Sequence, residues 1–378
     1  MRYYAMLADQ MKKDNESIES IATVVGTSKT TVTRFLNQSR QVAPEIAASI
    51  VRHLLPKYEL DFMSEFVMTL ARPENIRKSL EYCSVNRMFD QMKDLLDRAE
   101  TDRNGTVQEA YEVYSLIYKM QTGELTAKQV FDIVRCQKAS LPEHQILLRI
   151  IELCSIYNQG EYSWLMASKG NIEDDLNALE NSYLKSSLKC RLNEVMSAIT
   201  LRYLNQPKKA RSIAKRILDE QFASISAKAS AYSRVSASFL LEDYDRCVKY
   251  ARKAQKLYSR VERKDVVEIL EYNIQFASLL WGKSVDVFVS QDLRALSLSK
   301  AGETDSAMFI LTSLDDKEAT MSALREFYKG EVTADPKYYY NSMHMFMKKG
   351  DRYMAELSRI KLLNLGQPDY IVNAMFVA

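Results

Sequence analysis

Apolar residues recur every three or four positions along most of this chain, which is the spacing of one face of an α-helix. The pattern is clearest in AYSRVSASFLLEDYDRCVKYARKAQKLY, residues 231–258, where a polar turn separates two such stretches. In the first stretch the small residues Ser236, Ala237 and Ser238 allow a neighbouring helix to approach closely. The apolar face of the second stretch is formed by Tyr244, Val248, Ala251, Ala254 and Leu257. The pattern predicts two helices joined by a short turn.

Similar polar turns interrupt the rest of the chain, near Gly160, Pro207, Asp243, Gly302 and Gly350. Their spacing of roughly 35 to 60 residues is typical of helical hairpins of the tetratricopeptide type, with some longer units. Such hairpins stack into a superhelix whose concave surface generally binds an extended peptide or a partner helix. We therefore expect a helix-turn-helix domain and linker over 1–66, a tetratricopeptide-like domain over 67–355, and a C-terminal capping or dimerisation segment over 356–378.

Composition supports an all-α fold. Only 10 Gly and 7 Pro occur among 378 residues, and 47% of the residues are hydrophobic, which favours many helices over a β-sandwich or a Rossmann sheet. The longest apolar stretch, ILLRIIELCSIY, is interrupted by Arg149 and Glu152, so no membrane span is expected. The five cysteines form no CxxC pair, and the N-terminus lacks a signal peptide's apolar core. These features predict a cytoplasmic protein.

The stretch IATVVGTSKTTVTRFLN, Ile21 to Asn37, has the features of a DNA-binding helix-turn-helix. Ala22 is small enough for two helices to cross, and Gly26 tolerates the left-handed conformation that the turn needs. Ser28 is placed to cap the second helix. The residues at core spacing are Ile18, Ile21, Val32, Phe35 and Leu36.

The second helix of this motif presents polar and basic side chains. Lys29, Arg34 and Arg40 lie between Thr27 and Pro44 with no acidic residue among them, which favours a surface that binds phosphates. Hydroxyl, amide and guanidinium groups also bind base edges, and Thr30 and Arg34 are the leading candidates for that role. A hairpin that only packs on the next domain is the alternative. The predicted DNA-binding residues are Thr27, Ser28, Lys29, Thr30, Thr31, Thr33, Arg34, Asn37, Gln38 and Arg40.

Polar residues on the expected inner helices of the superhelix are candidates for peptide binding. They are Arg191, Asn193, Arg202, Lys228 and Arg234. For any one of them, a solvated charge or an ion pair between repeats is the more common role. The cluster as a whole therefore carries more weight than any member.

Nothing in the sequence indicates an enzyme. His53, His144 and His344 are far apart and lack metal-ligand spacing, so packing or surface roles are expected for them. No phosphate-binding glycine loop, dinucleotide fingerprint or nucleophile elbow is present. The aromatic run KYYYNSMHMFMKKG has the spacing of a helical core rather than of a cofactor site. We predict no catalytic residue, cofactor or metal.

Several stretches, taken in order, resemble the arbitrium receptors, peptide-controlled transcription regulators of phages that infect Bacillus. The resemblance rests on the helix-turn-helix and on IRKSLEYCSVNRMF (76–89), EVYSLIYKMQTGELTAKQVF (112–131), CRLNEVMSAITL (190–201) and FYKGEVTADPKYYYNSMHMFMKKGDRY (327–353). It covers nearly the whole chain. Each stretch is weak by itself, and their common order carries the comparison.

The resemblance implies a homodimer that binds double-stranded DNA at a promoter and activates a transcript opposing lysogeny. A short secreted hexapeptide, taken up again by the host, would bind the repeats and switch activation off. Arg77 and Asp351 match positions that line the peptide pocket, where an arginine suits a terminal carboxylate and an aspartate suits a basic side chain. The family dimerises through its C-terminus, so Ile371, Val372, Met375 and Phe376 are candidates for a dimer contact or for a cap.

Two departures from the family pattern concern the peptide. Ala198 and Arg202 stand where the family commonly has asparagines that hold the peptide backbone, so we expect a different peptide sequence here. The sequence thus predicts a peptide-responsive, DNA-binding regulator of a phage lysis-lysogeny decision. The alternatives are a receptor of the same architecture that acts on a protein partner, and a repeat scaffold without a ligand.

Overall fold

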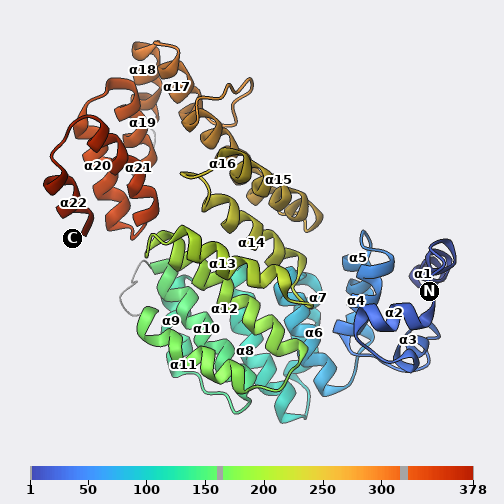
Figure 1. Ribbon diagram of the computed structural model, residues 1–378. Helices are drawn as coiled ribbons and strands as arrows, with labels where there is room; N and C mark the ends of the chain where they lie inside the picture. The colour runs from blue at the N-terminus through green and yellow to red at the C-terminus, as the bar shows by residue number, and fades with distance from the viewer. Residues whose placement is uncertain (1, 160–164, 316–321, 378) are drawn as a thin grey trace. The chain divides into compact units, whose positions relative to one another are not determined.

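The computed structural model describes residues 2–159, 165–315 and 322–377. Over these ranges the chain forms 22 α-helices and one short 3-10 helix, and no β-strand (Figure 1). This confirms the predicted all-α fold class. No helix in the described ranges is both long enough and apolar enough to cross a bilayer. The turn predicted near Gly160 lies outside the described residues.

The helices belong to two compact units. The N-terminal unit contains the chain up to Gln159 together with Leu165–Arg191 and Glu220–Ser226. The C-terminal unit contains Leu192–Asp219 and the chain from Ala227 onward. Within the described residues from 165 onward, the chain therefore passes between the units within α12 (Tyr183–Arg202), after Asp219, and again within α14 (Ile225–Ala237). The boundaries that we predict at residues 66 and 355 separate domains by function, whereas the two units are defined by their compactness. The predicted boundaries therefore stay predictions.

The N-terminal unit contains eleven complete α-helices, the first part of α12 and the segment Glu220–Ser226. Its elements are α1 (Arg2–Lys13), α2 (Ile18–Val25), α3 (Lys29–Leu36), α4 (Pro44–Leu54), α5 (Glu59–Phe66), η1 (Val67–Thr69), α6 (Pro73–Asn86), α7 (Phe89–Glu100), α8 (Gly105–Thr122), α9 (Ala127–Cys136), α10 (Pro142–Gln159) and α11 (Leu165–Ala178). Helices α6, α7 and α8 pack on one another, as do α9 and α10.

A buried carboxylate joins three helices of this unit. Glu81 on α6 accepts hydrogen bonds from the Arg191 guanidinium and the Ser187 hydroxyl on α12, and from the Tyr114 hydroxyl on α8. Burial acts to raise the pKa of Glu81, but Arg191 and these hydrogen bonds outweigh it and lower the pKa. The charged form is thus the stable one inside the core, where an unpaired charge would be very costly.

The C-terminal unit is a series of consecutive helices. They are the end of α12, α13 (Pro207–Asp219), most of α14, α15 (Tyr244–Arg260), α16 (Lys264–Leu280), α17 (Gln291–Lys300), α18 (Thr304–Asp315), α19 (Ala323–Thr333), α20 (Pro336–Lys348), α21 (Arg352–Asn364) and α22 (Asp369–Val377). Neighbours in sequence pack together, for example α15 with α16, α17 with α18 and α20 with α21.

The helix pair predicted over residues 231–258 is present as α14 and α15. The two helices are in contact, because the Ser236 hydroxyl donates a hydrogen bond of 2.7 Å to the Cys247 carbonyl and the rings of Tyr232 and Tyr250 stack. Ala251 and Ala254 are buried, as the spacing predicts.

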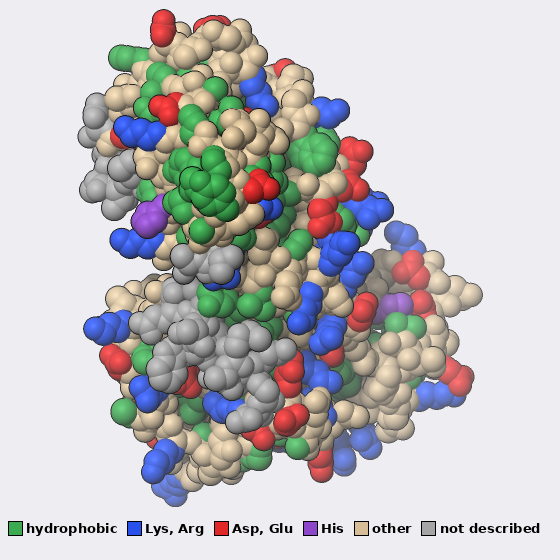
Figure 2. All heavy atoms as spheres, turned by 60° about the vertical axis from the view of Figure 1, so that its left-hand side comes forward, with side chains coloured by type: hydrophobic (Ala, Val, Ile, Leu, Met, Phe, Trp, Pro, Cys, Tyr) green, Lys and Arg blue, Asp and Glu red, His purple; other side chains and the backbone are tan. Residues whose placement is uncertain are grey.

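The surface is not uniform in chemistry. Hydrophobic side chains gather in one part of the face drawn in Figure 2, and Lys and Arg side chains gather in another. The large apolar side chains that are most exposed in the described C-terminal unit include Val287, Phe309 and Tyr370.

Candidate functional site

The helix-turn-helix consists of α2, a glycine turn and α3, and the sequence fixes each end. Ser17 caps α2 by accepting from the Ser20 amide. Gly26 has φ of 72°, in the left-handed region where glycine carries no steric penalty, and it ends α2. The Ser28 hydroxyl accepts from the Thr31 amide at 3.1 Å and starts α3. The predicted turn and cap are confirmed.

Apolar side chains hold the two helices together. Ile21, Ala22, Val32 and Phe35 are buried, in agreement with the sequence pattern. Ile18 and Leu36 are only half-buried. Val25, which has 2% exposure, belongs to this core and was missed by the sequence analysis, although it lies four residues after Ile21 on the same helical face.

The outer side of the motif is polar. Of the predicted DNA-binding residues, the exposed ones are Ser28, Lys29, Thr30, Arg34, Asn37, Gln38 and Arg40. Thr27, Thr31 and Thr33 are half-buried. The Thr33 hydroxyl donates to the Lys29 carbonyl at 2.9 Å, and the Thr31 hydroxyl lies 2.9 Å from the Ser28 hydroxyl. The hydroxyl groups of these two threonines therefore already have local hydrogen-bond partners. Within the described residues, the side chains of Thr30 and Arg34 form no hydrogen bond or ion pair.

One expectation about local charge needs correction. No acidic residue lies between Thr27 and Pro44 in sequence, but Glu19 on α2 reaches across the turn and pairs with Lys29 at 2.8 Å. The positive charge of Lys29 is thus opposed in space. The pair is exposed on both sides, so it is weak and a phosphate can compete for the lysine.

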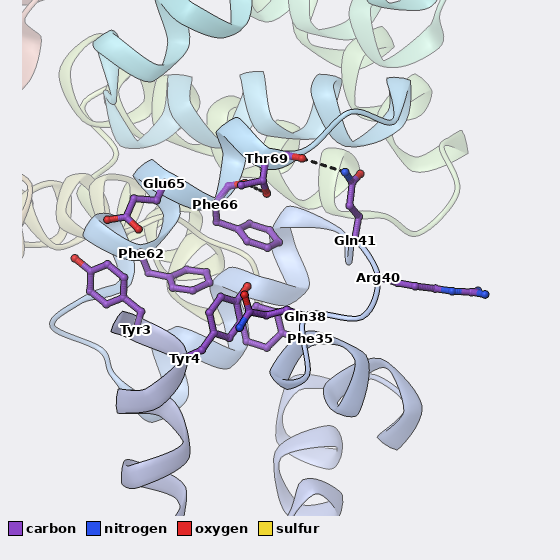
Figure 3. Close-up of a pocket in the computed structure, with 10 residues that line it drawn as sticks. All are labelled: Tyr3, Tyr4, Phe35, Gln38, Arg40, Gln41, Phe62, Glu65, Phe66 and Thr69. Carbon is purple, nitrogen blue, oxygen red and sulfur yellow. Dashed lines mark hydrogen bonds between the residues drawn. The ribbon is translucent and has the colours of Figure 1, made fainter. Parts of the chain in front are cut away.

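An aromatic cavity lies beside α3, in the same domain (Figure 3). Its volume is about 360 Å³, and Tyr3, Tyr4, Phe35, Phe62 and Phe66 line it. The Phe35 and Phe62 rings meet edge to face at 5.7 Å and fix α3 on α5. Figure 3 shows the Arg40 side chain pointing away from this cavity, so its charge is available at the surface.

The segment Glu220–Ser226 contacts the motif from another part of the sequence. The Gln221 side-chain amide donates a hydrogen bond of 2.9 Å to the Val25 carbonyl, directly before Gly26. The Arg52 guanidinium on α4 donates to the Ala223 carbonyl at 3.5 Å and also binds Glu59 with two hydrogen bonds. Sequence reasoning gave no signal for this contact, because almost 200 residues separate Val25 from Gln221.

A second polar site lies in the C-terminal unit. Arg202 on α12, Arg234 on α14 and Asp351 before α21 line a cavity of about 280 Å³ whose other walls are largely apolar. The Arg202 Nε lies 3.6 Å from the Asp351 carboxylate. Three of the predicted peptide-binding residues are thus brought together from distant parts of the chain. Charged groups at the edge of an apolar cavity are typical of ligand sites.

Asp351 also has a structural role. Its carboxylate caps α21 by accepting from the Met354 amide at 3.1 Å. Burial raises the pKa of Asp351, while Arg202, the Met354 amide and Arg234 oppose that shift. A cationic group entering the cavity would therefore favour the ionised carboxylate.

The other predicted peptide-binding residues lie elsewhere. Asn193 and Lys228 do not line this cavity. Arg77 belongs to α6 of the N-terminal unit, where its guanidinium lies 3.8 Å from Glu143. Ser233, Asn273 and Tyr353 line the cavity and were missed by the sequence analysis. Ser233 directly precedes Arg234 and Tyr353 lies two residues after Asp351, so both had a predicted neighbour in sequence, whereas Asn273 had none.

At the C-terminus, the four predicted contact residues differ in burial. Val372 has 0% exposure and packs inside its own chain, so it acts as a cap rather than as a surface for a partner. Ile371 is 39% exposed, while Met375 and Phe376 are half-buried. The Arg359 guanidinium lies over the Phe376 ring at 5.5 Å. Tyr370, with 76% exposure, extends the apolar surface and was missed by the sequence analysis.

One protein family and two phage proteins that are similar to this chain carry closely matching descriptions. The family described as "AimR transcriptional regulator-like" matches residues 58–364. The AimR transcriptional regulator of Bacillus phage phi3T is 24% identical over 98% of this chain and 100% of its own length. That of Bacillus phage SPbeta is 22% identical over 97% of this chain and 98% of its own length.

Solved structures share the fold. "Structure of SeMet-phAimR" superposes with a TM-score of 0.82 at 23% identity and covers 99% of both chains. "Structure of phAimR-Ligand" superposes with a TM-score of 0.69 at 24% identity, over 84% of this chain and 96% of the other.

Proposed function

The chain belongs to the AimR transcriptional regulator-like family, and we propose that it is a regulator that binds an operator through α2 and α3 and is switched by a short peptide. The observation that carries this proposal is the exposed polar face of α3. A serine-capped helix with Thr30, Arg34 and Asn37 exposed on a fixed aromatic core has the geometry of a recognition helix.

The proposed ligand is a short signalling peptide in the cavity of the C-terminal unit. Arg202 and Arg234 would bind an acidic side chain or the terminal carboxylate, and Asp351 would bind a basic side chain. A cavity of about 280 Å³ holds only part of a hexapeptide, so further contacts along a tetratricopeptide-like concave surface are part of the proposal. One related structure is described as ligand-bound, which agrees with a ligand site in this family.

We propose a homodimer that uses the C-terminal segment. Ile371, Tyr370 and the exposed edges of Met375 and Phe376 would form the contact, while Val372 serves as the cap beneath it. A twofold dimer presents two recognition helices to two half-sites of an operator. By family analogy the regulated transcript opposes lysogeny in a phage, and the peptide turns activation off in the host cytoplasm.

The contacts of α14 suggest how the peptide acts. Residues just before α14 bond to the helix-turn-helix domain, through Gln221 to Val25 and through Ala223 to Arg52. Ser233, Arg234 and Ala237, near the other end of the same helix, line the proposed peptide cavity. A peptide that binds one position of α14 better than another would shift the population of DNA-binding arrangements.

The proposal is tested by measuring retention of DNA fragments tiled across the gene's own neighbourhood, at fixed salt, with and without a synthetic peptide encoded just downstream. We expect specific retention of one fragment that is lost with peptide and lost in Arg34→Ala. Arg103→Ala, an exposed arginine outside the motif, serves as control and should bind like the wild type. Gln221→Ala should keep specific binding and respond less to peptide.

Other outcomes separate the alternatives. Retention that no peptide changes would leave a DNA-binding regulator without this switch. No specific retention, combined with stabilisation by the peptide, would indicate a peptide receptor that acts on a protein partner. Neither retention nor peptide stabilisation would indicate a repeat scaffold and would contradict the proposal.

A further inference from the structure

Two helices of the C-terminal unit carry a large local excess of positive charge. Helices α13 and α15 together contain eleven Lys and Arg and two Asp in 30 residues, a net charge of +9. The whole chain has a net charge of +3, so the remaining 348 residues carry −6. Concentration of positive charge on two helices of an otherwise acidic chain points to a local polyanion-binding surface.

The charges of each helix lie on one face. At 3.6 residues per turn, the exposed Lys208, Lys209, Lys215 and Arg216 of α13 fall within roughly 120° of one another. All six cations of α15 fall in a sector of the same size, with Lys249 and Lys256 near its centre. Each face includes a single acid, Asp219 on α13 and Asp245 on α15. We call these two faces together the basic stripe.

A shared aromatic ring connects the two halves of the stripe. The Arg211 guanidinium of α13 lies 4.0 Å from the Phe239 ring centroid, and the Arg246 guanidinium of α15 lies 5.5 Å from the same centroid. The Phe239 ring also stacks on Tyr250 of α15. The basic faces of α13 and α15 are therefore held as neighbours within one compact unit.

Several stripe residues are available for a ligand. Arg211 pairs with Glu242, Arg246 with Asp243 and Arg252 with Glu271. On the stripe, six exposed cations form no ion pair with another described residue: Lys208, Lys209, Lys215, Arg216, Lys249 and Lys256. The exposed Lys253 lies over the Tyr232 and Tyr250 rings instead. None of these six is neutralised by an ion pair in the structure. They outnumber Asp219 and Asp245, the two acids on the same faces, so an anionic ligand would meet few competitors.

The stripe lacks the features of a protein or membrane contact. None of the large hydrophobic side chains that are exposed in the described ranges lies on α13 or α15. Protein interfaces depend on aromatic and apolar anchors at their centre, and membrane-surface helices insert apolar side chains. The backbone of a nucleic acid requires only regularly placed cations.

The dimensions fit a duplex. Cations recur every three or four residues along α15 from Arg246 to Arg260, a length of about 21 Å. One DNA strand has a phosphate about every 3.4 Å of helix axis, so α15 alone spans about six phosphates. At the other end of the stripe, Arg216 lies five residues before Gln221, which bonds to Val25 in the helix-turn-helix. Whatever the arrangement of the two units, five residues of chain span at most about 18 Å.

We propose that the basic stripe binds the phosphate backbone of duplex DNA without reading its sequence, as a second DNA contact in addition to the recognition helix. Its role in regulation rests on the proposed function of the helix-turn-helix. The stripe would hold DNA that flanks the operator and would raise affinity for long fragments over short ones. Its binding to arbitrary duplex requires no operator.

The test measures fluorescence anisotropy of a labelled 40-bp duplex of random sequence, titrated with the full-length protein between 50 and 200 mM salt. The stripe variant is K215Q/R216Q/K249Q/K256Q. The control, K93Q/K119Q/K128Q/K138Q, removes the same charge from exposed lysines of the N-terminal unit. Losing four phosphate contacts should reduce the slope of log K against log salt by about 3 to 4 and weaken binding at least tenfold at the lower salt, whereas the control should stay within twofold of the wild type.

An unchanged slope in the stripe variant, or an equal loss in the control, would overturn the proposal. Loss of binding to polyglutamate with unchanged DNA binding would assign the stripe to an acidic protein and would also overturn it. The role of the recognition helix is measured separately on the operator with Arg34→Ala. If no operator is found and the stripe variant still loses random-duplex binding, the helix-turn-helix proposal fails and the stripe proposal stands.

Discussion

At the scale of single residues, a few buried polar groups are held in one protonation state by their neighbours. His144 is 1% exposed, and its Nδ1 lies 2.8 Å from the Glu109 carboxylate. Its Nε2 has no hydrogen-bond partner among the described residues. Burial lowers the pKa of His144, with Glu109 and Glu143 opposing and Arg77 adding to the shift. The neutral ring is therefore the stable form, because a second N–H at Nε2 would be buried without an acceptor.

This environment predicts a pH dependence of stability. Since the pKa of folded His144 lies below the unfolded value of about 6.5, its contribution is fully present above that pH and is lost as the pH falls. We expect the wild type to lose up to about 1 kcal/mol more unfolding free energy than His144→Gln between pH 7.5 and 5.5. Urea titrations at the two pH values provide the measurement, with the exposed His344→Gln as control. Equal losses in wild type and His144→Gln would contradict this account.

Glu109 titrates at a lower pH than His144. Burial acts to raise its pKa, but hydrogen bonds from Ser140, Leu141 and His144 outweigh that effect and lower the pKa of Glu109 to about 2. Its stabilising contribution is present above about 4.5 and is lost only as the pH falls toward 2. The two effects are therefore separable, and the difference expected between pH 7.5 and 5.5 belongs to His144.

At the scale of elements, close packing outweighs helix propensity in α19. Gly330 lies inside this helix, where alanine would ordinarily be favoured by about 1 kcal/mol. A Cβ atom at this position would lie 2.7 Å from the Tyr339 ring on α20. The Tyr339 hydroxyl donates a hydrogen bond to Glu331, so the ring cannot move away without losing that bond. The glycine is what allows α19 and α20 to approach.

We therefore expect Gly330→Ala to destabilise the protein by about 1–3 kcal/mol. Gly105→Ala is the matched control, because Gly105 begins α8 and a Cβ there meets nothing within 4 Å. That substitution should be neutral or slightly stabilising. Thermal unfolding of both variants, followed by circular dichroism, is the measurement. A Gly330→Ala protein as stable as the wild type would show that the Tyr339 ring moves at little cost.

At the scale of the whole molecule, the proposed dimer depends on a small apolar surface at the C-terminus. Tyr370 and Ile371 are exposed, and Val372 anchors the same helix to its own chain. A charged side chain in place of Ile371 would have to be desolvated in the dimer but not in the monomer. The substitution therefore separates association from folding.

We expect Ile371→Glu to shift the protein from dimer to monomer in light-scattering measurements at micromolar concentration, with an unchanged midpoint of thermal unfolding at low concentration. Ile133→Glu is the control, because Ile133 is similarly exposed on α9 of the N-terminal unit. It should leave the dimer intact. A dimer that survives Ile371→Glu would place the contact elsewhere on the chain.

Local sequence was sufficient for the helices and for the helix-turn-helix. Gly26 and Ser28 determine where α2 ends and α3 begins, since one needs positive φ and the other supplies a cap, and both effects act within a few residues. The 3.6-residue periodicity likewise placed the apolar face of α15, on which Ala251 and Ala254 are buried while Tyr244, Val248 and Leu257 are half-buried. These features were predicted correctly.

Contacts between distant parts of the chain were decided only by the tertiary structure. Glu19 reaches Lys29 across a turn, Gln221 bonds to Val25, and Arg202, Arg234 and Asp351 meet in one cavity. Local sequence does not predict such pairs, because they depend on how the helices pack and not on where each helix begins. The basic stripe is an intermediate case. The basic face of α13 and that of α15 each follow from local sequence, although the sequence analysis did not predict them, and packing around Phe239 makes the two faces one surface.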